Sequence, residues 1–166
     1  MEGRRCSRVC ESLERGSDMT FADELSQVST IFIDTAPVIY YIEAHPQFGP
    51  LAKEAFDLFL SGRLNAFSSV ITITEVLSKP IEVGDEKLAR KFAEFLEHGK
   101  NLSLMEISSN IAEKAGRLRG KYSDLRTIDA IQISSAIDAG ADIFLTNDKK
   151  LKQIKEMKVL VLKDYL

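Results

Sequence analysis

Hydrophobic and polar positions form two kinds of segment along most of the chain. Short apolar runs predict strands at residues 31–33, 65–68, 102–106, 142–146 and 158–162. Between them, apolar residues at helical spacing predict helices at roughly 37–44, 50–61, 70–78, 85–98, 108–121, 126–139 and 149–156. Strands separated by helices are typical of βαβ crossovers, so the pattern predicts an α/β fold in which helices cover both faces of a parallel sheet.

This regular pattern begins only near residue 30. We therefore expect one domain over residues 30–166, preceded by a poorly ordered extension over residues 1–29. Both cysteines of the chain, Cys6 and Cys10, lie in the extension and are expected to be free thiols. A structural zinc site needs about four ligands, and neither histidine is near this pair. Met19 is an alternative start of the functional chain.

Within the domain, the segment "SKPIEVGDE" at residues 78–86 is expected to be the most flexible internal connection. Pro80 and Gly84 both interrupt regular structure there.

Two aspartates follow directly on apolar strands. Asp34 ends the first strand and Asp148 ends the fourth, in "FLTND". Parallel α/β sheets bind ligands at the carboxyl ends of their strands, so both side chains are candidates for a site there. Asp142 begins the fourth strand, and six residues at about 3.3 Å each place it nearly 20 Å away from that edge. The structural alternative for Asp34 and Asp148 is that each caps the helix that follows.

Glu75 lies in a segment that also has a local explanation. The spacing of Thr72 and Glu75 fits a capping box, in which the glutamate bonds back to the first residue of a helix.

Asp129 has no such simple explanation. It lies in "LRTIDAIQISSAIDAG", which is apolar on nearly every helical face, and its helical neighbours include Leu125 and Ile133. A carboxylate on a buried surface costs several kcal/mol unless it is paired, protonated or bound to a cation. An ion pair with Arg126 is the structural alternative to a metal-binding or catalytic role.

If the four acids meet, they form an all-oxygen site. Such sites suit hard cations, Mg²⁺ or Mn²⁺, with the remaining coordination positions left to water and phosphate. Crowded carboxylates also repel one another, so without a metal some of them should hold protons.

The motifs Asp34-Thr35, Thr72-x-x-Glu75, "TIDAIQISSA" and "TND" occur in an order and spacing that resemble the PIN-domain nucleases. The similarity is greatest to the toxin ribonucleases of toxin–antitoxin pairs, the VapC-type proteins. The resemblance implies an α/β/α sandwich with a five-stranded parallel sheet, and endoribonuclease activity that depends on Mg²⁺ or Mn²⁺. It implies that Asp34, Glu75, Asp129 and Asp148 are the metal-binding and catalytic acids, supported by Thr35 and Thr146. It also implies a homodimer and an antitoxin protein as partner.

The net charge of −3 gives no obvious RNA-binding surface. Without the four acids, however, the rest of the chain carries +1. Basic clusters on either side of Asp129 and Asp148 give candidates for phosphate contacts, with Tyr122 as a stacking surface. The candidates are Arg117, Arg119, Lys121, Arg126, Lys149 and Lys150. The alternative is that these residues form ordinary solvated helix faces.

Other function classes fit less well. A phosphatase of the haloacid dehalogenase type needs a second acid two residues after the first, and position 36 is Ala. A response-regulator receiver needs paired acids near the first strand, where Asp34 is alone. A catalytically inactive PIN fold that binds RNA or protein remains the alternative. The sequence contains no apolar run of the ~20 residues that span a membrane, which predicts a cytoplasmic protein.

Overall fold

The computed structural model describes residues 19–166, so Cys6 and Cys10 lie outside the described residues. Five parallel strands form one sheet in the order β3-β2-β1-β4-β5. The strands are β1 (Thr30–Ile33), β2 (Asn65–Ser69), β3 (Leu102–Met105), β4 (Ile143–Thr146) and β5 (Lys158–Val161). The predicted α/β sandwich with a five-stranded parallel sheet is confirmed.

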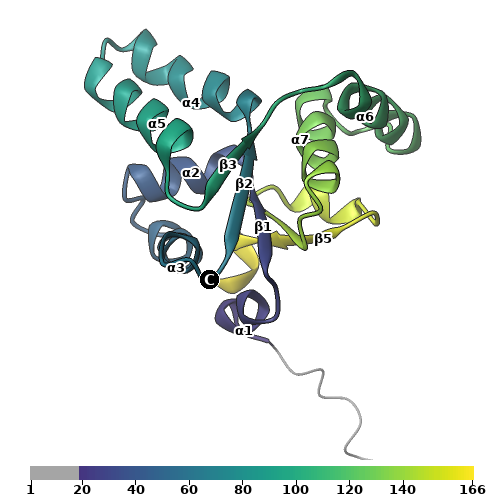
Figure 1. The fold of residues 1–166 in the computed structure, drawn as a ribbon, viewed down its shortest axis with the longest axis horizontal. Helices are drawn as coiled ribbons and strands as arrows, with labels where there is room; N and C mark the ends of the chain where they lie inside the picture. Colours follow the sequence, from purple (N-terminus) through teal and green to yellow (C-terminus); the bar gives the residue numbers. More distant parts are fainter. Residues whose placement is uncertain (1–18) are drawn as a thin grey trace, which may run out of the picture.

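Helices cover both faces of the sheet (Figure 1). One face carries α2 (Thr35–Ile42), α3 (Gly49–Leu60), α4 (Val70–Glu82) and α5 (Glu86–His98). The other carries α6 (Ser109–Lys121) and α7 (Thr127–Asp138). After β3 the chain crosses to the far side of β1, so the strand order reverses between β1 and β4. Such a reversal opens a crevice at the carboxyl ends of the two strands, where α/β sheets bind ligands.

The central strand β1 contributes to both halves of the core. Ile31 and Ile33 face the cluster under α2 to α5, whereas Phe32 faces the cluster under α6 and α7. Phe32 stacks on Phe144 of β4, with ring centroids 5.4 Å apart and an interplanar angle of 10°. The alternation follows from the two-residue period of a strand, and burial on both faces explains why β1 is apolar throughout.

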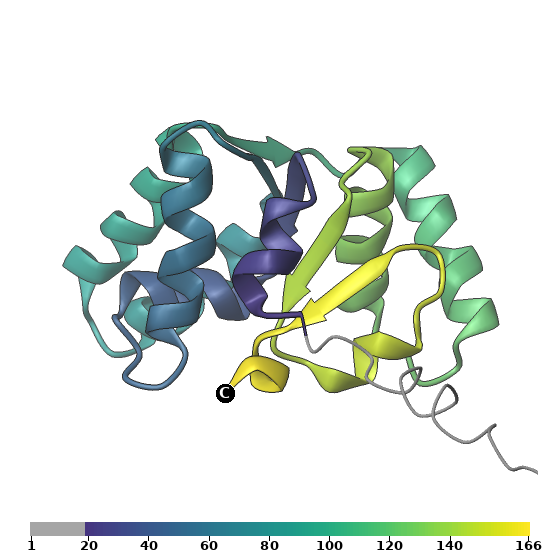
Figure 2. The ribbon, with the colours of Figure 1, turned by 90° about the horizontal axis from the view of Figure 1, so that it is seen from below.

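The packed domain begins earlier than residue 30. Helix α1 (Phe21–Ser26) starts with a capping box, in which Thr20 and Asp23 each accept a hydrogen bond from the other's backbone N–H. Phe21 and Leu25 are buried in the core, and the Phe21 ring packs on Tyr165 with centroids 5.1 Å apart. Residues 19–29 therefore do not belong to a poorly ordered extension. Helix α1 lies beside the C-terminal end of the chain (Figure 2).

Two predicted boundaries also differ. Helix α4 continues through Pro80 to Glu82, so the connection to α5 is shorter than the predicted loop at 78–86. Pro80 removes one backbone hydrogen bond, but its ring is buried and the helix ends two residues later. The segment predicted as a helix at 149–156 is a short 3₁₀ helix, η1 (Lys149–Gln153), and a second one, η2 (Leu162–Tyr165), ends the chain. None of the described helices is both long and apolar enough to span a membrane.

Candidate functional site

Asp34 lies at the point where β1 meets β4. Its backbone N–H donates to Leu145 O at 3.0 Å, which continues the pairing of the two strands one residue beyond β1. The Thr146 hydroxyl donates to Asp34 Oδ2 at 2.7 Å, and the Thr35 backbone N–H donates to Oδ1 at 2.8 Å. Asp34 is thus also the N-cap of α2, so the structural role proposed from sequence is present.

The Asp34 carboxyl group lies in an unfavourable place for a negative charge. The pKa of Asp34 is raised from the usual 3.8 to about 6, mainly because the protein shields the carboxyl group from water and, to a smaller extent, because of the charges of Glu75 and Asp129. The hydrogen bonds from Thr146 and Thr35 act in the opposite direction but do not balance the burial. Asp34 therefore titrates close to neutral pH.

Glu75 does not form the predicted capping box. Helix α4 begins at Val70 with Ser69 as N-cap, so Glu75 lies in the second turn, beyond reach of the helix start. Its Oε2 instead accepts a hydrogen bond from the Thr35 hydroxyl. The prediction was wrong because strand β2 runs directly into α4, and no turn separates them. Thr72 is buried and bonds to Ser68 and Gln132.

Asp129 reaches the same edge from the opposite layer. Helix α7 leads into β4 and runs antiparallel to it, so its first turn lies near the carboxyl ends of the strands. Asp129 is the third residue of α7, where the helix dipole stabilises a negative charge. The helix predicted at 126–139 begins one residue later in the structure, at Thr127, and the favourable effect of the helix dipole on Asp129 was not considered.

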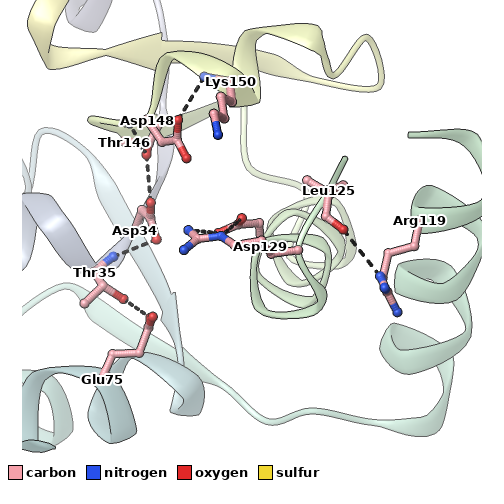
Figure 3. A network of polar contacts seen from close by, with 10 residues as sticks. Asp34, Thr35, Glu75, Arg119, Leu125, Asp129, Thr146, Asp148 and Lys150 are labelled. Atoms are coloured by element: carbon pink, nitrogen blue, oxygen red, sulfur yellow. Dashed lines mark hydrogen bonds and ion pairs between the residues drawn. The ribbon is translucent and has the colours of Figure 1, made fainter. Parts of the chain in front are cut away.

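The predicted structural partner of Asp129 is present. Arg126 Nε donates to Asp129 Oδ2 at 2.7 Å, and Nη2 donates to Oδ1 at 3.0 Å. The Asp129 side chain is 10% exposed and that of Arg126 is 74% exposed. Asp129 nevertheless faces the same cavity as Asp34, and its charge contributes to the raised Asp34 pKa. The ion pair therefore belongs to the site and does not turn Asp129 away from it (Figure 3).

Asp148 completes the group from the end of β4. Its carboxylate caps η1 by accepting the Lys150 backbone N–H at 2.9 Å, as predicted, and its own N–H donates to Thr146 Oγ1 at 3.1 Å. Asp142 begins the other end of this segment and accepts hydrogen bonds from Ser29 and Thr30. As expected, Asp142 takes no part in the site.

The four acids line one cavity of about 600 Å³, together with Thr35 and Thr146. Four cationic residues lie around it, Arg126, Lys149, Lys150 and Lys163. Of the predicted phosphate contacts, the three on α6 are elsewhere: Arg117 pairs with Glu113, Lys121 pairs with Glu156, and Arg119 donates to Leu125 O. Figure 3 shows Arg119 directed away from the acids. Helix α6 lies behind α7, so the sequence proximity of these residues to Asp129 was misleading.

Three further residues of the cavity were missed. Asn147 Nδ2 donates to the Tyr40 hydroxyl at 2.9 Å, and Asn147 Oδ1 accepts the Lys163 backbone N–H at 3.0 Å. The buried Asn147 thereby ties the end of β4 to α2 and to the C-terminal segment. Its place in "TND" was a usable signal, whereas nothing in the sequence placed Tyr40 or Lys163 beside the acids.

The chemistry of the four side chains suits a hard divalent cation, because all four are oxygen donors and their negative charges repel one another, as the raised pKa of Asp34 shows. Their arrangement is not that of a loaded site. Within residues 19–166, no three Asp, Glu, His or Cys side chains are grouped closely enough to hold a metal ion. Both oxygens of Asp129 are instead bonded to Arg126. The donor set therefore fits a cation, provided that this ion pair opens.

Comparison with solved structures shows the same fold in toxin–antitoxin proteins. VapBC2 from Rickettsia felis, solved with a DNA fragment from its promoter, aligns with a TM-score of 0.64 and 18% identity, over 80% of this chain and 98% of that one. A toxin–antitoxin complex from Klebsiella pneumoniae gives 0.59 and 22%, over 80% and 97%. VapC20 from Mycobacterium tuberculosis, a toxin that cleaves the sarcin–ricin loop, gives 0.57 and 16%, over 69% and 86%.

The likeness extends to the sequence at the level of the family. No curated protein matches the chain. The PIN domain family, however, matches residues 31–157, from the start of β1 almost to β5, and this range includes all four acids. The chain is therefore a member of the PIN domain family.

Proposed function

We propose that this protein is an endoribonuclease that depends on Mg²⁺ or Mn²⁺, and that it acts as the toxin of a toxin–antitoxin pair. The observation that carries the proposal is the meeting of Asp34, Glu75, Asp129 and Asp148 around one cavity at the β1–β4 crevice. These acids come from four separate segments of the chain, and helix capping or ion pairing at each one separately does not explain why all four line the same cavity. Membership of a family of nucleases supports the proposal.

The four carboxylates would hold the divalent ion. When bound, such an ion activates water for attack on the phosphodiester and neutralises charge on the phosphate. Hydroxyl groups of the chain orient these carboxylates. The Thr146 hydroxyl donates to Asp34 and accepts a hydrogen bond from the Asp148 backbone N–H. The Thr35 hydroxyl donates to Glu75. These contacts limit the freedom of the side chains before substrate arrives, which is what a preorganised site requires.

The cations around the cavity would hold the RNA backbone. Lys149, Lys150 and Lys163 line it beside the acids, and Lys149 is held by an ion pair with Asp164 at 3.1 Å. Among the candidates taken from sequence, Lys149, Lys150 and Arg126 are supported by their location, whereas Arg117, Arg119 and Lys121 are not.

An antitoxin protein is the proposed partner, because several of the matching structures are toxin–antitoxin complexes. A homodimer and a cytoplasmic location stay predictions from the sequence.

A cleavage assay on a labelled single-stranded RNA tests the proposal. The protein should cut with Mg²⁺ or Mn²⁺ and not with EDTA, and Asp34→Asn or Asp148→Asn should lose about 100-fold or more of the rate. Asp57→Asn is the matched control, because Asp57 is an exposed acid on α3 that pairs with Lys53. Cleavage that survives in both site variants comes from another source and would refute the proposal.

The same assay separates the second candidate, an inactive PIN fold that binds RNA or protein. The Arg126–Asp129 ion pair favours this candidate, because it gives Asp129 a partner without any metal. RNA that binds without being cut under any divalent ion would establish it.

A further inference from the structure

The acidic cavity contains a cation supplied by the chain itself. Arg126 is the N-cap residue of α7, and its side chain lines the same cavity as the four acids. Two of its nitrogens bond to the two oxygens of Asp129, in the forked geometry that makes an arginine–carboxylate pair strong. Asp129 would otherwise be an almost buried carboxylate with no cationic partner among the described residues.

Arg126 also interacts with the other acids. The charges of Asp148 and Glu75 add to that of Asp129 in raising the Arg126 pKa, so the guanidinium group lies in the field of the whole cluster. A smaller cavity of about 140 Å³ is lined by Arg126, Asp129, Asp148 and Lys150, among others. The ion pair thus borders two hollows that both contain site acids.

The pair is built so that it can open. The Arg126 side chain is 74% exposed, and within residues 19–166 it makes no side-chain hydrogen bond except those to Asp129. A guanidinium group held on one side only can turn into solvent, where water replaces the bonds that it loses. The cost of opening the pair then falls on the almost buried Asp129 carboxylate, whose charge a divalent ion would compensate. The carboxylate cannot move away in the same manner, since it is fixed in the first turn of α7.

A divalent ion and Arg126 need the same atoms. Cation coordination uses the oxygen lone pairs of Asp129, and both oxygens already accept hydrogen bonds from the guanidinium group. While the pair is closed, neither oxygen of Asp129 is therefore free of the guanidinium group, although Asp129 lines the same cavity as the other three acids.

We propose that Arg126 is an internal counter-cation, which holds Asp129 in the metal-free protein and must release it before a divalent ion can bind with full coordination. The inference rests on the metal site of the proposed function. It assigns Arg126 a role before substrate arrives, and so differs from its use as a simple phosphate contact. Arg126 would stabilise the metal-free fold and lower the affinity for metal, both through the same pair.

Calorimetric titration with Mn²⁺, without RNA and at fixed ionic strength, tests the inference. Arg126→Gln should bind Mn²⁺ about five- to tenfold more tightly than the unmodified protein, because the metal no longer has to break a charge-assisted pair. Lys150→Gln is the matched control. It removes one positive charge from the same cavity, but no ion pair of the described residues involves Lys150, so its effect should stay below about threefold.

Thermal unfolding in EDTA gives a second measurement, independent of the metal. Arg126→Gln should unfold at a lower temperature than Lys150→Gln, because Asp129 loses its partner, and saturating Mn²⁺ should raise its unfolding temperature by more. Circular dichroism confirms that each variant is folded.

The outcomes separate the inference from the proposed function. If the unmodified protein binds Mn²⁺ and Arg126→Gln binds it equally or more weakly, the inference fails and the metal site stands. Equal tightening in Arg126→Gln and Lys150→Gln would also overturn the inference, because general charge would then explain both. If no variant binds a divalent ion, both proposals fail.

Discussion

The partly buried charge of Asp34 gives a measurable dependence of stability on pH. The Asp34 pKa is about 6 in the folded protein, against the ordinary value of 3.8, which applies to the unfolded chain. Between these values the folded state binds a proton that the unfolded chain does not, so stability falls as pH rises. The contribution is fully present below about pH 4 and is lost as pH rises through 6. The difference between the two pKa values corresponds to at most about 3 kcal/mol.

Asp34→Asn removes this charge with little change in shape. The amide oxygen can still accept the Thr35 N–H, and the amide nitrogen can donate to the Thr146 hydroxyl. We expect the variant to match the unmodified protein near pH 4 and to exceed its free energy of unfolding by up to about 3 kcal/mol at pH 7.5. Urea unfolding in EDTA, repeated at pH intervals of about half a unit, measures the gap.

The groups that face Asp34 set the control conditions. The charges of Glu75 on α4 and Asp129 on α7 both raise the Asp34 pKa. Arg126 stays positively charged from pH 4 to 7.5, so its ion pair with Asp129 does not change through its own titration. Asp57→Asn should follow the unmodified protein at every pH. Unfolding curves for Asp34→Asn and the unmodified protein that stay parallel from pH 4 to 7.5 would refute the assignment of the raised pKa.

Three further predictions test the surroundings of the site. Thr146→Val removes the hydroxyl that stabilises the Asp34 carboxylate, so the Asp34 pKa should rise. The fall in the free energy of unfolding, which ends near pH 6 in the unmodified protein, should then extend to higher pH in the variant, and the same pH dependence in both proteins would contradict this. Phe21→Ala should lower the free energy of unfolding by about 3–5 kcal/mol in urea titration if α1 is part of the core, whereas a loss below about 1 kcal/mol would place it outside. Gln132→Met keeps the side-chain volume but removes the hydrogen bonds to Ser69 and Thr72, at 2.5 and 2.9 Å. The free energy of unfolding in urea should fall by about 1–3 kcal/mol, and no change would show that these bonds do not stabilise the packing of β2 and α4 on α7.

The sequence by itself determined the fold class and the positions of two acids. Strand periodicity and the alternation of strands with helices can be read along the chain, and they predict a parallel sheet with Asp34 and Asp148 at the same edge, because each follows an apolar strand. The apolar surroundings of Asp129 made it a candidate as well, and the resemblance to the PIN domain nucleases grouped it with Glu75 and the other two acids.

Only the tertiary structure decided how these acids are held. Whether Glu75 caps a helix depends on where α4 begins, and that point is set by β2 packing against its neighbours, not by the Thr72–Glu75 spacing. The arginines of α6 are close to Asp129 in sequence, yet α7 separates them from the cavity, whereas Lys163 comes to it from the end of the chain. The Arg126–Asp129 pair was one of two open alternatives, because a charge on a buried helix face requires a partner but does not specify which one. Sequence patterns indicate which side of each helix or strand is buried. The packing of helices on both faces of the sheet decides which charged side chains lie next to one another.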